Sequence, residues 1–190
     1  MTTENGWKTL SHFLEQEAAI GKRSNFTRRP RDFYSTPLAA VRPLIPHLND
    51  AKRFAEPCCG EGDLVRHLES FGLECIYQGD MHTGANALAR DRYGRGKYNI
   101  ITNPPHTRSD MHKLIEHFQE IAPTWLLIDL DWVANLQAVP YLPQCSDIVI
   151  IGRVKWIEGS EYTGKENFAW YRFDANYNGP TKILNHRGLK

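Results

Sequence analysis

The feature that most constrains the fold is an alternation, from about residue 50 onward, of short apolar runs with segments of helical periodicity. The runs cover residues 53–56, 75–78, 98–102, 125–130 and 148–151. The segments between them carry apolar stripes at helical spacing, formed by Leu64, Val65 and Leu68 and by Met111, Leu114, Ile115 and Phe118. This order of elements predicts an α/β fold in which a mostly parallel central sheet has helices on both faces.

Two segments depart from this alternation. Residues 168–173 follow a polar loop without a helical pattern, so we expect this strand to pair antiparallel with its predecessor at one edge of the sheet. Twenty positions separate Asp80 from Ile100, which leaves little room for both a helix and a strand. We therefore expect this part of the fold to be abbreviated.

The N-terminal part differs from the rest of the chain. Residues 7–20 have the apolar spacing of an amphipathic helix, and a basic segment follows it. Thr36 and Pro37 resemble the N-cap and the first residue of a helix. The sequence predicts an N-terminal helix and basic segment over residues 1–31 and a single domain over residues 32–190. The basic residues of the segment are Lys22, Arg23, Arg28, Arg29 and Arg31.

Composition excludes several classes of protein. The four cysteines include the adjacent pair Cys58 and Cys59 and have no C-x-x-C spacing, so we expect neither a zinc site nor a disulfide framework. The histidines have no metal-ligand spacing, and we expect no metal. No run approaches the roughly 20 apolar residues of a membrane span, and the first residues do not resemble a signal sequence. We expect a soluble, cytoplasmic protein.

The loop after the first expected strand, residues 56–62, has the composition of a ligand-binding turn. Gly60 and Gly62 remove side chains where a ligand approaches the carboxyl edge of a parallel sheet. A dinucleotide-binding turn has a third glycine where this chain has Val65. The acidic Glu56 suits a cationic sulfonium with an amino-acid tail better than a pyrophosphate. Asp80, at the end of the second strand, is placed to accept hydrogen bonds from ribose hydroxyls.

The loop Asn103-Pro104-Pro105-His106 after the strand at 98–102 is the sharpest signal in the chain. Two prolines stiffen the loop and leave carbonyl oxygens that no neighbouring amide binds. An exocyclic amino group has two N–H donors, which the Asn103 side-chain oxygen and the Pro104 carbonyl can accept. This pairing draws the nitrogen toward tetrahedral geometry and frees its lone pair to attack a methyl sulfonium.

With these loops the chain resembles class I S-adenosylmethionine-dependent amino methyltransferases, whose acceptor motif is [DNS]-P-P-[YFW]. More narrowly, residues 32–170 are similar to small DNA adenine methyltransferases of phages and prophages. The resemblance implies a Rossmann-like fold and S-adenosylmethionine as the cofactor. It implies cofactor contacts from Tyr34 and Thr36, from the methionine-binding loop (Glu56, Pro57, Cys58, Gly60, Gly62), from Asp80 at the ribose, and from Met81 and Asp91 at the adenine. It also places Asn103, Pro104, Pro105 and His106 at the acceptor.

The resemblance implies methylation of adenine N6 in DNA, with the base flipped from a duplex or presented in a single strand, in the host cytoplasm if the chain is phage-encoded. His106 stands where the family has the aromatic residue that stacks on the flipped base. The N-terminal basic segment and a second cluster (Arg90, Arg92, Arg95, Lys97) are candidates for phosphate contacts at the mouth of the site. Two alternatives stay open: methylation of a protein glutamine at N5, and a non-catalytic cofactor-binding homologue.

Overall fold

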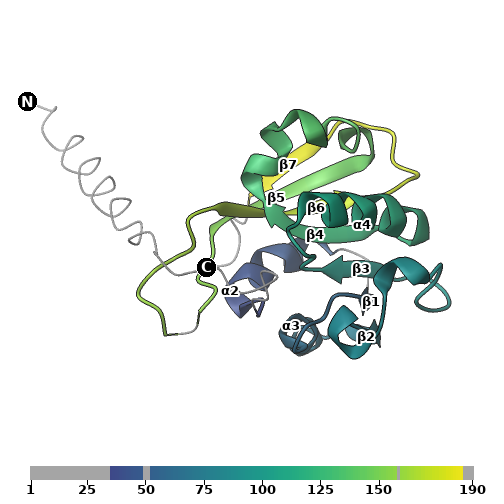
Figure 1. Cartoon of the computed structure of the whole chain (residues 1–190), viewed down its shortest axis with the longest axis horizontal. Coiled ribbons are helices and arrows are strands. Elements are labelled where there is room, and N and C mark those ends of the chain that lie inside the picture. The colour runs from purple at the N-terminus through teal and green to yellow at the C-terminus, as the bar shows by residue number, and fades with distance from the viewer. Residues whose placement is uncertain (1–34, 49–51, 158, 186–190) are drawn as a thin grey trace, which may run out of the picture.

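A computed structural model describes residues 35–48, 52–157 and 159–185 (Figure 1). The helix expected over residues 7–20, the basic segment and Tyr34 lie outside these ranges, and the proposed division of the chain at residues 31 and 32 stays a prediction. The described residues include one seven-stranded sheet in the order β2-β1-β3-β4-β6-β5-β7. The strands are β1 (Arg53–Glu56), β2 (Glu74–Gln78), β3 (Asn99–Thr102), β4 (Thr124–Asp129), β5 (Cys145–Arg153), β6 (Asn167–Phe173) and β7 (Lys182–Asn185).

The central strands bury side chains on both faces, because alternate residues point to opposite sides of the sheet. Ile100 packs into the cluster that also holds Met111 and Phe118 of helix α4 (Arg108–Ile121). Ile101, the next residue, packs into a second cluster on the other face, with side chains from α2 (Leu38–Val41) and α3 (Asp63–Ser70). The predicted α/β fold, with helices on both faces of a mostly parallel sheet, is confirmed (Figure 1).

β6 is antiparallel to its neighbours, as predicted, but it does not lie at the edge of the sheet. It pairs with β5 on one side and with β4 on the other, and β7 pairs parallel with β5 at the outer edge. The position follows from burial, since Ala169, Trp170 and Tyr171 are fully buried and an edge strand would expose one side of its backbone. The indole nitrogen of Trp170 also donates to the carbonyl of Ala40, 2.8 Å away, which ties α2 to the sheet.

The short connection between β2 and β3 is confirmed as abbreviated. It holds two 3₁₀ turns, η3 (Met81–Thr83) and η4 (Ala87–Ala89), and neither an α-helix nor a strand. The predicted helix start at Thr36 is wrong by one residue, because Pro37 occupies the cap position of α2 with an extended backbone and no side-chain cap. The Thr36 hydroxyl instead contacts Asn103.

Two prolines, Pro43 and Pro46, limit the length of this helix, and α2 passes at once into the 3₁₀ helix η2 (Arg42–His47). No helix in the described ranges is long and apolar enough to cross a membrane.

Candidate active site

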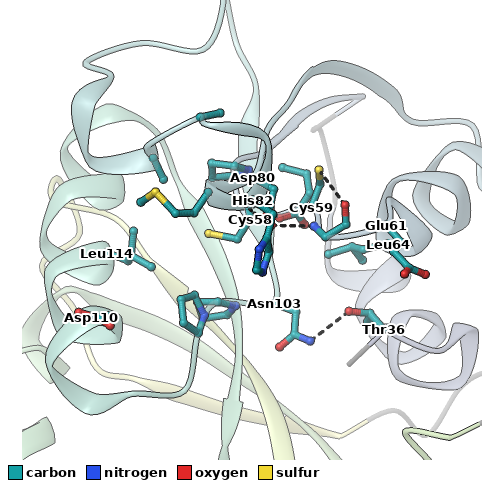
Figure 2. A pocket seen from close by; sticks show the side chains of 18 of the residues that line it. Thr36, Cys58, Cys59, Glu61, Leu64, Asp80, His82, Asn103, Asp110 and Leu114 are labelled. Carbon is teal, nitrogen blue, oxygen red and sulfur yellow. Dashed lines mark hydrogen bonds between the residues drawn. The ribbon is translucent and has the colours of Figure 1, made fainter. Parts of the chain in front are cut away.

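A cavity of about 550 Å³ lies at the carboxyl ends of β1, β2 and β3, within the usual range for small-molecule sites. The edge is where parallel α/β sheets bind ligands, since the loops that leave neighbouring strands converge there. The loop after β1, Asp80 after β2 and the acceptor loop after β3 all line it (Figure 2). The sequence-predicted residues in its wall are Thr36, Glu56, Pro57, Cys58, Gly60, Asp80, Met81, Asn103, Pro104 and Pro105.

The turn between β1 and α3 is held by backbone hydrogen bonds, one within the turn and one to the residue that follows β2. The amide of Cys59 donates to the carbonyl of Gly79 (2.9 Å), and the amide of Gly62 donates to the carbonyl of Cys59 (2.7 Å). Gly60 and Gly62 adopt left-handed conformations, with φ of 52° and 80°, which side-chain-bearing residues disfavour. Gly62 lies at the cap of α3 rather than in the cavity wall, so its contribution is to the shape of the turn.

Glu56, the last residue of β1, is a fully buried carboxyl group in the cavity wall. Its Oε1 accepts hydrogen bonds from the Cys58 amide, at 3.0 Å, and from the Thr102 hydroxyl. Its Oε2 is buried without a hydrogen-bond partner among the described residues. Burial raises the pKa of Glu56 to about 8, against the two hydrogen bonds that lower it. A cationic ligand next to this group would favour its ionised form.

Asp80 lies two residues after the end of β2, with its carboxylate fixed by two backbone amides. Its Oδ2 accepts from the Gly60 amide (2.9 Å) and its Oδ1 from the His82 amide (2.8 Å). Each oxygen keeps a further lone pair, so the carboxylate can accept hydroxyl protons from the cavity. Met81 lies beside it in the wall and is 63% exposed, which leaves its side chain available to cover a flat ring.

Asn103 projects from the end of β3 toward the cavity (Figure 2). Its Nδ2 donates to the Thr36 hydroxyl over 3.2 Å. Its Oδ1 is buried and has no hydrogen-bond partner within the part of the chain that the structure describes. A buried acceptor without a donor is costly to leave unpaired, so this oxygen is suited to a ligand N–H. Pro104 is buried and Pro105 exposed, and both line the cavity.

Besides Gly62, three predicted residues are not in the cavity wall or are not described. The half-buried His106 points elsewhere, with its ring edge-on to Phe168 and the ring centroids 5.5 Å apart. Asp91 is exposed and does not line the cavity. Tyr34 lies outside the described residues. The expected contact of Asp91 with the cofactor adenine therefore remains a prediction to which the cavity adds no support.

Sequence reasoning missed the wall contributed by η4 and α4. Asn86, Leu88, Asp110 and Leu114 line the cavity on this side, and Asp110 and Leu114 belong to the helix that follows the acceptor loop. The helical stripe marks Leu114 as apolar and buried, but a stripe does not show that one end of a helix borders a cavity. Figure 2 shows Asp110 and Leu114 across the cavity from Thr36.

An ion pair ties the first turn of α4, which follows the acceptor loop, to the end of β4. Arg108, two residues after His106, contacts both carboxylate oxygens of Asp129 at 3.0 and 3.2 Å. The sequence pattern favours a turn or cap role for Asp129 and Asp131 over a catalytic pair. Asp129 lies at the end of β4, and its carbonyl also accepts from the Tyr171 hydroxyl. Asp131 is exposed.

The second basic cluster does not lie together at the mouth of the cavity. Arg53, the first residue of β1, donates to the carbonyl of Arg95 over 2.8 Å, so Arg95 lies at the amino end of the sheet. Lys97 follows in the same loop, just before β3 begins. The cluster precedes the acceptor loop in the chain, but β3 carries the chain across the sheet between the two. Among the described residues, no group of His, Cys, Asp and Glu is arranged to hold a metal ion.

The fold is shared with solved methyltransferase structures. One is a putative class I S-adenosylmethionine-dependent methyltransferase from Listeria monocytogenes, with a TM-score of 0.51, 9% identity, and coverage of 94% of this chain and 71% of the other. Another is the methyltransferase subunit of a type I restriction-modification system from Streptococcus thermophilus, with a TM-score of 0.52 and 11% identity; 91% of this chain matches 50% of that one. A putative RNA methyltransferase from Pyrococcus horikoshii gives a TM-score of 0.55 at 14% identity, over 85% and 97% of the two chains.

At these identities the likeness establishes the fold, which is that of class I S-adenosylmethionine-dependent methyltransferases. No family model matches the sequence, and no curated protein does so significantly. The chain spans half the length of the restriction-modification subunit.

Proposed function

We propose that this protein binds S-adenosylmethionine and transfers its methyl group to an exocyclic amino nitrogen, with adenine N6 in DNA as the acceptor. The observation that carries the proposal is the buried Asn103 Oδ1, which has no hydrogen-bond partner among the described residues and lies in the wall of the cavity that Gly60 and Asp80 also line. One cavity thus combines features suited to an amino acid–nucleoside cofactor with an acceptor for an amino group.

The residues present fit this cofactor. Glu56 offers a buried carboxyl oxygen without a partner, which suits a cationic group in a poorly solvated site. Gly60 leaves the backbone of the turn open to close approach. Asp80 offers acceptors for ribose hydroxyls, while Met81 and Leu114 offer apolar surface for a flat base. The cofactor supplies an activated methyl group on a sulfonium.

Asn103 and Pro104 act on the acceptor. Their oxygens would accept the two N–H groups of the amine, which draws the nitrogen lone pair out of the ring and toward the methyl carbon. With the cofactor bound, the new N–C bond would form as the S–C bond breaks with its electron pair on sulfur. The methylated nitrogen would then release one proton to water. No strong base is needed before transfer, because the amine is neutral and attacks with its own lone pair.

Adenine N6 in DNA is the acceptor we favour, on the family resemblance of the acceptor loop and the N-terminal basic segment. A glutamine carboxamide presents the same two N–H donors, so the Asn103 geometry does not by itself separate the two substrates. In this structure the His106 ring packs edge-on against Phe168. Stacking of His106 on the flipped base is a further part of the proposal.

The test supplies tritiated S-adenosylmethionine with unmethylated genomic DNA, total RNA or a protein extract as the acceptor. We expect label in DNA, and N6-methyladenine in the nucleosides released from it. Asn103→Ala should lose about 10²-fold or more of the rate, as when a single aligned polar group is removed from other active sites, and should still bind S-adenosylhomocysteine within a few-fold of wild type. Label confined to protein would support glutamine methylation, and cofactor binding without transfer to any acceptor would support the non-catalytic alternative.

A further inference from the structure

Thr36 and Asn103 are joined by a hydrogen bond in the wall of the cavity, although they are 67 positions apart in the sequence. Thr36 is 5% exposed and lies just before α2, while Asn103 follows β3. The Asn103 Nδ2 donates to the Thr36 Oγ1 over 3.2 Å, and the dashed line in Figure 2 marks this bond. The oxygen of the same amide is the unpartnered acceptor described above.

The direction of this hydrogen bond decides what the amide presents to a ligand. A carboxamide has a donor end and an acceptor end, and anchoring the donor end turns the acceptor end away from the anchor. In the opposite orientation the Asn103 NH₂ would face the NH₂ of the acceptor base, and two donors form no hydrogen bond. In that orientation the Asn103 NH₂ could instead donate a hydrogen bond to a carbonyl oxygen of a ligand.

A hydroxyl can accept from Nδ2 or donate to Oδ1, so the Thr36 proton matters. Thr36 lines the cavity, and within the described ranges its hydroxyl proton is given to no protein acceptor. An acceptor in the cavity that takes this proton leaves the Thr36 lone pair for the Asn103 amide. The carboxylate of an amino-acid tail is an acceptor of that kind.

We propose that Thr36 is a positioning residue that holds the Asn103 amide with its oxygen toward the group to be methylated, and so selects amino over carbonyl acceptors. This inference rests on the proposed function. It assigns Thr36 a second task beyond the cofactor contact that the family resemblance implies, and it links cofactor binding to the order of the acceptor site.

The first measurement compares Thr36→Val with Thr36→Ser. Valine keeps the shape of threonine without a hydroxyl, and serine keeps the hydroxyl. With saturating cofactor, we expect Thr36→Val to slow single-turnover methyl transfer to DNA by about tenfold, the effect of removing one hydrogen bond, and Thr36→Ser to retain most of the rate. Thermal unfolding of each variant shows whether it is folded.

The second measurement needs no methyl transfer. With S-adenosylhomocysteine saturating, the affinities for single-stranded oligo-dA and oligo-dT of equal length are compared, because thymine offers a carbonyl and no exocyclic amine. Wild type should prefer oligo-dA, Thr36→Val should narrow this preference, and Thr36→Ser should restore it. In the Asn103→Ala background the same Thr36→Val change should have no further effect, since its action passes through the amide.

The inference would be overturned if a folded Thr36→Val variant kept the wild-type preference for oligo-dA. It would also be overturned if Thr36→Val had the same effect in the wild-type and the Asn103→Ala backgrounds. Thr36 would then be a cofactor contact only, visible as weaker S-adenosylhomocysteine binding in calorimetry. Failure of the proposed function gives a different result, because wild type itself would then bind no cofactor or label no nucleic acid.

Discussion

Glu56 shows how one residue can link the stability of the protein to its ligand. A carboxyl group without solvent contact is held neutral by its surroundings, and its hydrogen bonds from Thr102 and Cys58 only partly oppose this. At neutral pH a buried acid with a raised pKa lowers the free energy of unfolding, because the unfolded chain releases the proton that the folded protein keeps. The proposed cationic cofactor would account for the place of Glu56 in the wall of the cavity, where one of its oxygens has no hydrogen-bond partner among the described residues.

The first prediction concerns the pH dependence of folding. The pKa of Glu56 rises from an ordinary 4.5 to about 8 on folding. The folded state therefore holds a proton that the unfolded state releases, and this contribution to stability is complete below about pH 4.5 and is lost as the pH rises through 8. We expect the free energy of unfolding to fall over this range by on the order of 1 kcal/mol per pH unit. Glu56→Gln should remove this fall.

Urea denaturation of the ligand-free protein at several pH values provides the measurement. Glu120→Gln is the matched control, because it makes the same substitution at an exposed carboxyl group. If wild type and Glu56→Gln share one pH profile, then Glu56 is ionised in the folded protein.

The second prediction compares two acids that the family resemblance assigns to the cofactor. Asp80 lines the cavity and holds the Gly60 amide, whereas Asp91 is exposed and outside it. Asp80→Ala should weaken S-adenosylhomocysteine binding by at least about tenfold, because it removes the ribose acceptors and loosens the turn. Asp91→Ala should leave the affinity unchanged. Calorimetry on both variants checks this, and a large decrease in affinity in Asp91→Ala would restore the sequence-based role of that residue.

At the scale of elements, the sequence predicts what local patterns encode. The apolar runs mark β1 to β5. In β1, β3 and β4 they reflect burial on both faces, whereas β2 is only partly buried at the edge of the sheet. The acceptor loop and the turn at 56–62 are readable because proline and glycine each impose a backbone requirement. These local signals are enough to predict that Glu56, Asp80 and Asn103 meet at one edge of the sheet.

Long-range pairings and weakly patterned elements are not readable in this way. β7 has only Leu184 partly buried and no alternation, and its pairing with β5 fixes it at the edge. The insertion of β6 between β4 and β5 depends on both partners at once. The hydrogen bond between Thr36 and Asn103 likewise cannot be predicted without knowing how α2 packs on the sheet. The local sequence pattern indicates only that Thr36 is a helix cap.

The third prediction concerns the ion pair that anchors the first turn of α4 to the end of β4. Arg108 and Asp129 are partly exposed, at 38% and 17%, so solvent screens the pair and its contribution to stability is small. Its effect should instead be on the position of the acceptor loop that leads into α4. Asp129→Asn should slow methyl transfer several-fold while changing the melting temperature little.

Asp131→Asn is the matched control for this variant, since Asp131 is exposed and only two residues away. Transfer rates and thermal melts of both variants are compared under the same conditions. A large drop in melting temperature without a change in rate would show that the ion pair supports the fold and not the loop.

At the scale of the whole molecule, the path of the chain places Arg95 and Lys97 away from the cavity. β1 and β3 run parallel, so the cavity lies at their carboxyl ends and Arg95 lies with Arg53 at the other end. A nucleic acid that delivers a base to Asn103 must pass over the carboxyl edge of the sheet. Phosphate contacts are therefore expected near that edge and not near Arg95 or Lys97.

The last prediction uses this position of Arg95 and Lys97. Replacing Arg28, Arg29 and Arg31 of the N-terminal basic segment with alanine should flatten the plot of log DNA affinity against log salt by about 0.9 for each phosphate that the variant no longer neutralises. Replacing Arg95 and Lys97 should leave the slope as in wild type, although both sets remove positive charge. Filter binding to duplex DNA over a range of salt concentrations measures both slopes. Both sets of substitutions lower the net positive charge. Only a difference between their two salt-dependence slopes therefore indicates that DNA follows a defined path over the protein. Equal flattening would mean that DNA is attracted by overall charge, and no flattening in either would leave another part of the surface to contact the backbone.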